Sequence, residues 1–263
     1  MIPYFYYPTI TLGPFTLYVW GLFVAIGIIT AASLALRQEK RNGLDPNIIV
    51  GWCLWIVLGA FVGARLFHVF FYNWPYYQTH LVDALKIWEG GLSSFGGFTG
   101  AIIVSLIYFR NKKIRLLAYA DAIMYGFPLG WGIGRIGCFI THLHIGRLSN
   151  LPFAVAFPGG ARLDMGLIEA AIMLTYGLIR LSRERKQKRP AGFYLAHTMI
   201  FYGVMRFILD FGRATDITMP DARYFGLTPA QYGSIALVFG GIYLVWHISS
   251  PVASSNQVDD ASS

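Results

Sequence analysis

Arginines and histidines stand close together in one glycine-rich apolar stretch, GWGIGRIGCFITHLHIGR, which runs from Gly130 to Arg147. Arg135 lies inside the apolar run, and His142 and His144 follow just beyond it. A guanidinium binds anions through its planar fork, and an imidazole exchanges protons near neutral pH. These residue types in this order predict an anion-binding site with proton-transfer groups beside it.

Further arginines stand in apolar surroundings elsewhere in the chain. Arg65 and Arg206 lie, like Arg135, within or at the end of long apolar segments. A charge at membrane depth costs about 2.5–3.5 kcal/mol on insertion scales, so it normally faces a partner or a wet cavity. Asp210 follows Arg206 by four residues and can pair with it on one helix face. The simpler alternatives are snorkelling anchors and structural ion pairs. Three arginines on one side instead predict an anionic site that opens outward.

The composition places these residues in a membrane protein. The chain has 263 residues, of which 56% are hydrophobic and only 13% charged. That charged fraction is about half the usual soluble value of roughly 25%. We expect one integral-membrane domain over residues 1–250. The acidic, serine-rich end, residues 251–263, is predicted to be a disordered cytoplasmic tail.

Apolar segments long enough to cross a bilayer recur along the chain, and each crossing needs about 20 residues. The expected fold class is therefore all-α, a polytopic membrane protein with about seven transmembrane helices. The predicted spans are residues 16–36, 48–72, 92–110, 119–139, 164–181, 192–211 and 230–248.

The basic residues predict the orientation. Thirteen of the 21 lysines and arginines fall in three loops that share one side if there are seven spans. The positive-inside rule makes that side cytoplasmic, with the N-terminus outside and the C-terminus inside. The net charge of +8 is thus mainly a topology signal. No basic face interleaved with aromatic residues predicts binding of nucleic acid.

Several ordered motifs resemble one family, the prolipoprotein diacylglyceryl transferases of the bacterial inner membrane. GRIGCFITHLHIGR is similar to the family signature, and WEGGLS, YGVMRFILDFGRATD and GLTPAQYGSIALVFGG resemble other family elements. The resemblance implies seven transmembrane helices and no cofactor. It implies transfer of diacylglycerol from phosphatidylglycerol to the lipobox cysteine of prolipoproteins, the first step of lipoprotein maturation. The expected partners are phosphatidylglycerol, prolipoprotein signal peptides and membrane lipids. No set of residues predicts a metal site, because two histidines are too few ligands.

The resemblance also implies residues of the site, and each is matched to the family motifs one at a time. Arg135 matches the signature arginine and is expected to bind the lipid phosphate. Arg206 is the second expected catalytic arginine. The remaining residues expected to bind substrate are Arg65, Gly146, Arg147, Glu169 and Asp210.

The chain departs from the family at several positions. The family histidine is replaced by Phe95, the first signature asparagine by Cys138 and a first-span tyrosine by Trp20. Attack by a thiol at neutral pH benefits from a base. We therefore expect His142 or His144 to be that base, with the other orienting it; alternatively, both are hydrogen-bonded interfacial residues.

Two alternative functions remain open because of these replacements. One is a phospholipid-dependent transferase with a different acceptor. The other is a non-catalytic lipid-binding membrane protein on the same scaffold. The retained arginines favour a transferase.

Overall fold

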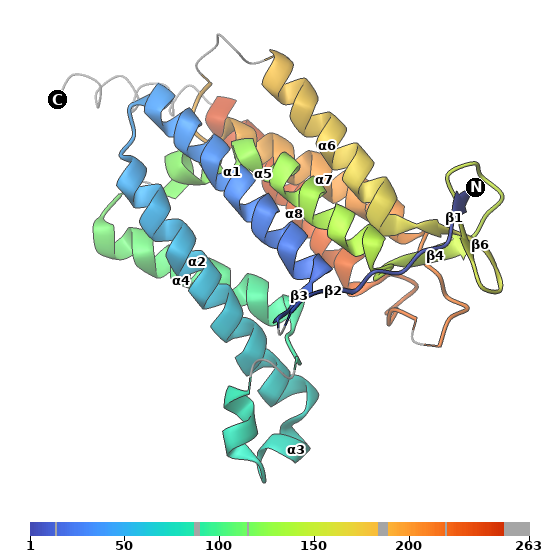
Figure 1. Ribbon diagram of the computed structural model, residues 1–263. Helices are drawn as coiled ribbons and strands as arrows, with labels where there is room; N and C mark the ends of the chain where they lie inside the picture. Colours follow the sequence, from blue (N-terminus) through green and yellow to red (C-terminus); the bar gives the residue numbers. More distant parts are fainter. Residues whose placement is uncertain (14, 87–89, 115, 184–188, 219, 250–263) are drawn as a thin grey trace. The chain divides into compact units, whose positions relative to one another are not determined.

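Long helices dominate the computed structural model, which describes residues 1–13, 15–86, 90–114, 116–183, 189–218 and 220–249. Within these residues, seven helices are 18 to 25 residues long (Figure 1). They are α1 (Val19–Asn42), α2 (Pro46–Phe67), α4 (Ser94–Lys112), α5 (Leu116–Ile140), α6 (Met165–Arg183), α7 (Phe193–Asp210) and α8 (Pro229–Ser249). Each predicted span overlaps one of them.

Membrane character is clearest for part of this set. Four helices are long and apolar enough to cross a bilayer: α1, α2 with its extension to Tyr72, α6 and α8. The extension is a π-helix, His68–Tyr72, and it is followed by two short helices, α3 (Trp74–Tyr77) and the 3₁₀ helix Leu81–Leu85. The chain is thus mostly helical with membrane-spanning helices, and the count of seven spans stays a prediction.

The expectation of an all-α fold is wrong in one respect, because the chain also forms strands. A four-stranded sheet has the order β1-β5-β6-β4, built from β1 (Ile2–Pro3), β4 (Ile145–Leu148), β5 (Val155–Phe157) and β6 (Gly160–Asp164). β1 pairs in parallel with β5, and the other pairs are antiparallel. A separate hairpin joins β2 (Thr9–Leu12) to β3 (Phe15–Tyr18). These segments are too short for a bilayer-length apolar run, so hydropathy does not reveal them.

The chain divides into two compact units, Met1–Gln38 with Ala120–Ser263, and Glu39–Tyr119. The second unit pairs α2 with α4. Asp45 caps the start of α2 by accepting from the Asn47 backbone N–H at 2.9 Å, and Pro46 occupies the first turn. Trp52 on α2 donates through Nε1 to Ser105 Oγ on α4 at 2.8 Å. The expected single domain over residues 1–250 stays a prediction, and the predicted tail lies outside the described residues.

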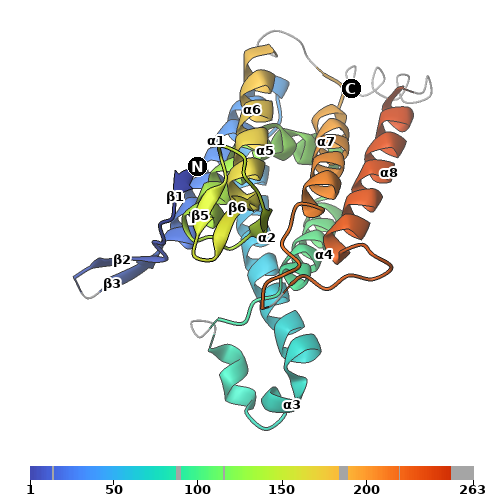
Figure 2. The ribbon, with the colours of Figure 1, turned by 90° about the vertical axis from the view of Figure 1, so that its right-hand side faces the viewer.

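The first unit contains α5 to α8, with the four-stranded sheet beside the end where α5 finishes and α6 begins (Figures 1 and 2). α5 packs closely against α1 at two glycines. A Cβ added to Gly130 would lie 2.5 Å from the carbonyl oxygen of Gly27, so no larger residue fits without a backbone shift. Small residues allow this approach of two helices. The contact fixes the helix that carries Arg135.

Candidate active site

A buried carboxylate, Glu169 on α6, joins side chains from two other helices. Glu169 is only 1% exposed. Arg135 on α5 places Nε 3.1 Å from Glu169 Oε1, and Arg206 on α7 donates from its NH1 nitrogen to Glu169 Oε2 at 3.1 Å. Trp131 Nε1 also donates to Oε1, at 2.7 Å. Because an isolated buried charge is costly, the carboxylate and the guanidinium groups stabilise one another.

Arg206 has a second acidic partner. Its NH2 nitrogen lies 3.1 Å from Asp210 Oδ1, one helical turn further along α7. Asp210 is itself 1% exposed and accepts a hydrogen bond from Thr228 Oγ1 just before α8. Both terminal nitrogens of Arg206 therefore bind carboxylates, and this guanidinium is fixed in place.

Arg135 is bound differently. Only its Nε approaches Glu169, while its NH1 nitrogen has a long contact of 3.9 Å to Cys138 Sγ. Its guanidinium carbon lies 4.9 Å from the centroid of the Trp131 ring. Tyr202 also hydrogen-bonds to the Arg135 side chain. No carboxylate of the described residues forms an ion pair with the terminal nitrogens of Arg135, so these nitrogens carry charge that an anionic ligand can neutralise.

More cations gather where α7 ends. Arg213 pairs with Asp221, Arg147 donates to the Phe211 carbonyl oxygen, and Arg223 donates to the Asp210 carbonyl oxygen at 3.4 Å. Burial lowers the pKa of Arg213, as do Arg206 and Arg135, and this is partly opposed by Asp221. With Arg135 and Arg206 there are five arginines here, and their ion pairs involve three carboxylates: Glu169, Asp210 and Asp221. The surplus of positive charge suits an anionic ligand.

His144 lies within this group of arginines. Arg213 donates from NH1 to His144 Nδ1 at 3.4 Å. Burial, followed by the charges of Arg135, Arg213 and Arg206, lowers the pKa of His144 to about 3. The imidazole is therefore neutral at pH 7 and acts as a hydrogen-bonding group. With its pKa lowered in this way, His144 is a weak base in the free protein.

His142 has other neighbours. It is buried, and its Nδ1 lies 2.7 Å from Asp164 Oδ2. Its ring lies against Tyr4, with centroids 5.3 Å apart, and against Phe157, with centroids 4.8 Å apart. Nε2 is buried and has no hydrogen-bond partner in the described part of the chain. Asp164, not His144, orients this imidazole, so the expectation that one histidine orients the other is not what the structure shows.

The end of the signature stretch joins two segments. A Cβ on Gly146 would lie 2.8 Å from the Leu163 carbonyl oxygen and 2.9 Å from that of Gly212, so glycine alone fits between them. The Arg147 backbone N–H donates to the Gly212 carbonyl oxygen at 2.9 Å. Gly146 and Arg147 thereby attach β4 to the segment that follows α7.

Arg65, in the second unit, donates hydrogen bonds to backbone carbonyl oxygens. Nε donates to Ala84 O at 2.8 Å. NH1 donates to Gly90 O and Gly91 O, and NH2 donates to Asp83 O and Lys86 O. Five bonds account for all five donors of a guanidinium. The structure thus gives Arg65 a set of partners other than the phosphate that the resemblance implies.

Known proteins resemble this chain over most of its length. The sequence matches the family described as prolipoprotein diacylglyceryl transferase over residues 8–247. The chain belongs to this family. It is 33% identical over 202 residues to the phosphatidylglycerol--prolipoprotein diacylglyceryl transferase of Geobacter sulfurreducens. The aligned region covers 75% of this chain and 78% of that protein. Proteins of the same name from Escherichia coli O1:K1 / APEC and Shigella boydii serotype 18 are 31% identical over 264 residues, with 90% of this chain and 91% of each protein covered.

In this member of the prolipoprotein diacylglyceryl transferase family, the structure brings Arg135, Glu169, Arg206 and Asp210 into one cluster, with His144 nearby. Trp131 and Arg213 belong to the same neighbourhood and were not expected there. Trp131 stands four residues before Arg135, so helical spacing places the two on one face of α5. Arg213 stands in the motif YGVMRFILDFGRATD, but its place beside Arg135 and Arg206 depends on the chain path after α7.

Proposed function

We propose that this chain transfers the diacylglyceryl group of phosphatidylglycerol to the cysteine thiol of prolipoproteins. Relatives with that name cover most of the chain. For these residues, the proposal rests on Arg135, whose terminal nitrogens form no ion pair with a carboxylate of the described residues, and on the surplus of positive charge around it. Phosphatidylglycerol is a phosphodiester with one negative charge, and an oriented guanidinium binds two of its oxygens.

The reaction makes a carbon–sulfur bond and breaks a carbon–oxygen bond. The cysteine sulfur attacks the glyceryl carbon, and glycerol phosphate leaves with the electrons of the broken bond. The leaving group gains negative charge as the thiol gives up its proton. Preorganised cations stabilise charge that develops in the transition state. Arg135 is the proposed contact to the phosphate, and Arg206, fixed by Glu169 and Asp210, supplies charge behind it.

His144 is the proposed proton acceptor, because of the two histidines it is the one beside the arginines. Its low pKa in the free protein opposes that role. A bound phosphate adds negative charge next to the same arginines and raises this pKa. The donor lipid would therefore prepare the base before the thiol is deprotonated. His142, paired with Asp164 among aromatic rings, has the proposed role of holding the loop that carries His144.

The remaining predicted residues have supporting roles in this proposal. Arg65 holds the backbone of residues 83–86 and 90–91 through its five hydrogen bonds. Gly146 and Arg147 fix the position of β4. The proposed setting is the bacterial plasma membrane, with seven spans, the N-terminus outside and the C-terminus in the cytoplasm.

Replaced family positions favour a second candidate, a phospholipid-dependent transferase with another acceptor. Phe95 is 49% exposed where the family has a histidine, and Cys138 is buried where the signature has an asparagine. One experiment separates the candidates: complementation of a strain depleted of its own diacylglyceryl transferase, with the lipoprotein product examined by mass spectrometry. Diacylglyceryl-modified cysteine supports the first candidate. Consumption of phosphatidylglycerol by the purified protein without that product supports the second, and no consumption contradicts both.

A further inference from the structure

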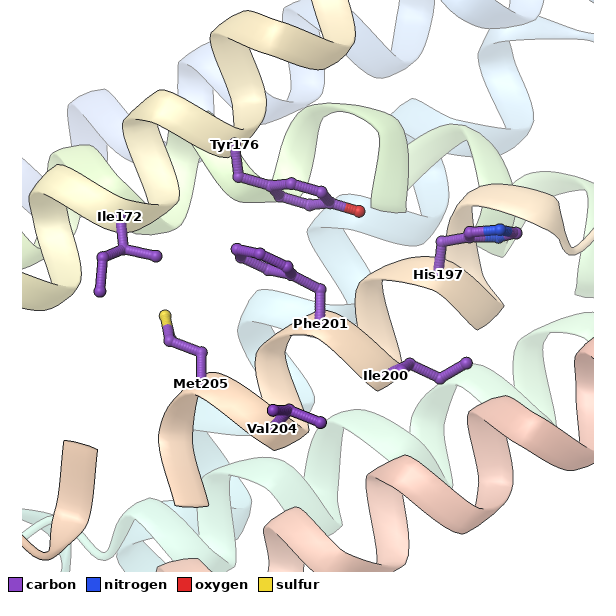
Figure 3. A pocket seen from close by; sticks show the side chains of 7 residues that line it. All are labelled: Ile172, Tyr176, His197, Ile200, Phe201, Val204 and Met205. Carbon is purple, nitrogen blue, oxygen red and sulfur yellow. The ribbon is translucent and has the colours of Figure 1, made fainter. Parts of the chain in front are cut away.

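An apolar groove lies between α6 and α7 (Figure 3). Its volume is about 520 Å³, within the range of ligand pockets. Seven side chains line it: Ile172, Tyr176, His197, Ile200, Phe201, Val204 and Met205. Tyr176 and Phe201 stack across it, with ring centroids 3.9 Å apart and planes at 10°. The size and apolar lining suit a hydrocarbon chain.

A buried cation without an acidic partner lies next to this groove. Arg180, one helical turn after Tyr176 on α6, is only 8% exposed. It donates from NH1 to Thr198 Oγ1 at 2.7 Å, and its NH2 nitrogen is buried without a hydrogen-bond partner among the described residues. None of the described residues forms an ion pair with Arg180. This differs from Arg135 and Arg206, each of which forms an ion pair with Glu169.

Aromatic rings enclose Arg180. Its guanidinium carbon lies 4.6 Å from the centroid of the Tyr194 ring, 5.3 Å from that of Tyr176 and 5.9 Å from that of Tyr125. Such contacts stabilise a cation but leave its charge uncompensated. Tyr176 belongs to both sites, because one ring faces Phe201 in the groove and also Arg180.

A second cation lies at the same end. Arg189 is exposed and stands over the Phe193 ring, 4.8 Å from its centroid. Phe193 in turn contacts His197, with ring centroids 4.0 Å apart, and His197 lines the groove. An apolar groove with arginines at one end is complementary to a molecule with a hydrocarbon chain and an anionic head.

We propose that α6 and α7 bind one anionic phospholipid, with an acyl chain in the groove and its phosphate at Arg180 and Arg189. In the proposed orientation this end faces the cytoplasm, where the leaflet carries anionic lipids. The groove lining contains none of Arg135, Glu169, Arg206 and Asp210, and the proposal does not depend on the proposed transfer reaction. Its occupant is a structural or regulatory lipid that fills the space between the two helices.

Photo-crosslinking tests the proposal with a lipid other than the proposed donor. The full protein is reconstituted in phosphatidylcholine vesicles that contain phosphatidylserine with a photoreactive acyl chain, and the labelled peptides are identified by mass spectrometry. We expect labelling of the segment around Ile200 and Val204. Unlabelled phosphatidylserine should compete, whereas inorganic phosphate should not. Competition by inorganic phosphate would overturn the lipid assignment, and equal competition by phosphatidylcholine would overturn the anionic one.

Matched variants test the two parts of the site. Arg180→Gln with Arg189→Gln should reduce labelling roughly tenfold or more, as expected for loss of hydrogen bonds to a charged group. Arg183→Gln is the control, because it removes an equal charge from an exposed position in the last turn of α6. Ile200→Trp should block labelling by filling the groove, whereas Ile179→Trp, exposed and outside the groove lining, should not. Unchanged labelling in Ile200→Trp would overturn the proposal, even if the arginine variants failed to fold.

Discussion

Arg135 and Arg206 bind opposite oxygens of one carboxylate although they belong to different helices. Arg135 Nε lies 3.1 Å from Glu169 Oε1, and the Arg206 NH1 nitrogen lies 3.1 Å from Oε2. The two guanidinium groups would repel each other without Glu169 between them. One buried acid thus fixes α5, α6 and α7 together at the proposed phosphate site.

Glu169→Gln should destabilise the protein by about 3–5 kcal/mol, because it leaves buried arginines without their shared counter-ion. The amide keeps nearly the same shape, so the loss reports charge and not packing. Thermal unfolding in a fixed detergent measures the change. Asp216→Asn is the control, since Asp216 pairs with Arg162 but its side chain is 51% exposed. That variant should change stability only slightly, because solvent screens an exposed ion pair; equal losses in the two variants would contradict the role given to Glu169.

Arg135→Ala should lower the transfer rate by roughly 10²–10³-fold, the loss seen when one preorganised transition-state donor is removed. Arg135→Lys should also be poor, because a point charge does not replace the two-pronged fork. Rates are measured with purified protein at equal folded amounts, with Arg183→Ala as the exposed control. A lysine variant with most of the parent activity would show that bidentate phosphate binding is the wrong role for Arg135.

His144→Ala should reduce transfer roughly 100-fold, the usual contribution of a general base. His142→Ala should act mainly on thermal stability, since it removes the partner of buried Asp164. Rate and melting temperature are measured for both variants. Near-parental rates in both would leave the histidines without a catalytic role.

The low pKa of His144 also predicts a pH dependence of stability. The unfolded imidazole takes up a proton near pH 6.5, whereas the folded one stays neutral to about pH 3. The stability that neutral His144 contributes is therefore fully present above pH 6.5. It is lost as the pH falls from about 6.5 towards 3. Between pH 7.5 and 5.5 the loss is about 1.4 kcal/mol. His144→Gln should remove that part of the pH dependence, measured as unfolding free energy at both pH values; an unchanged slope would argue against the low pKa.

Reporter fusions check the proposed topology. Fusions after residues 45, 80 and 186 should report inside, outside and inside, because the basic clusters occupy one side of the predicted seven spans. The last of these positions lies outside the described residues. A cytoplasmic signal at residue 80 would refute the proposed map.

Several features followed from the sequence by itself. Membrane character, the helical segments and the family signature around Arg135 are properties of continuous stretches, because the length and polarity of a segment are local quantities. The fifth predicted span, residues 164–181, corresponds to α6, Met165–Arg183. The pairing of Arg206 with Asp210 followed in the same way, since four residues make one helical turn.

Only the tertiary structure decided which partner each charged side chain binds. Arg65 binds five carbonyl oxygens, His142 binds Asp164, and Glu169 receives both Arg135 and Arg206. The sheet likewise pairs Ile2 with Val155, far away in the chain. A guanidinium has five donors and accepts any oxygen that its neighbours present. Its partners therefore depend on which helix faces and loops meet, and hydropathy and spacing do not determine that.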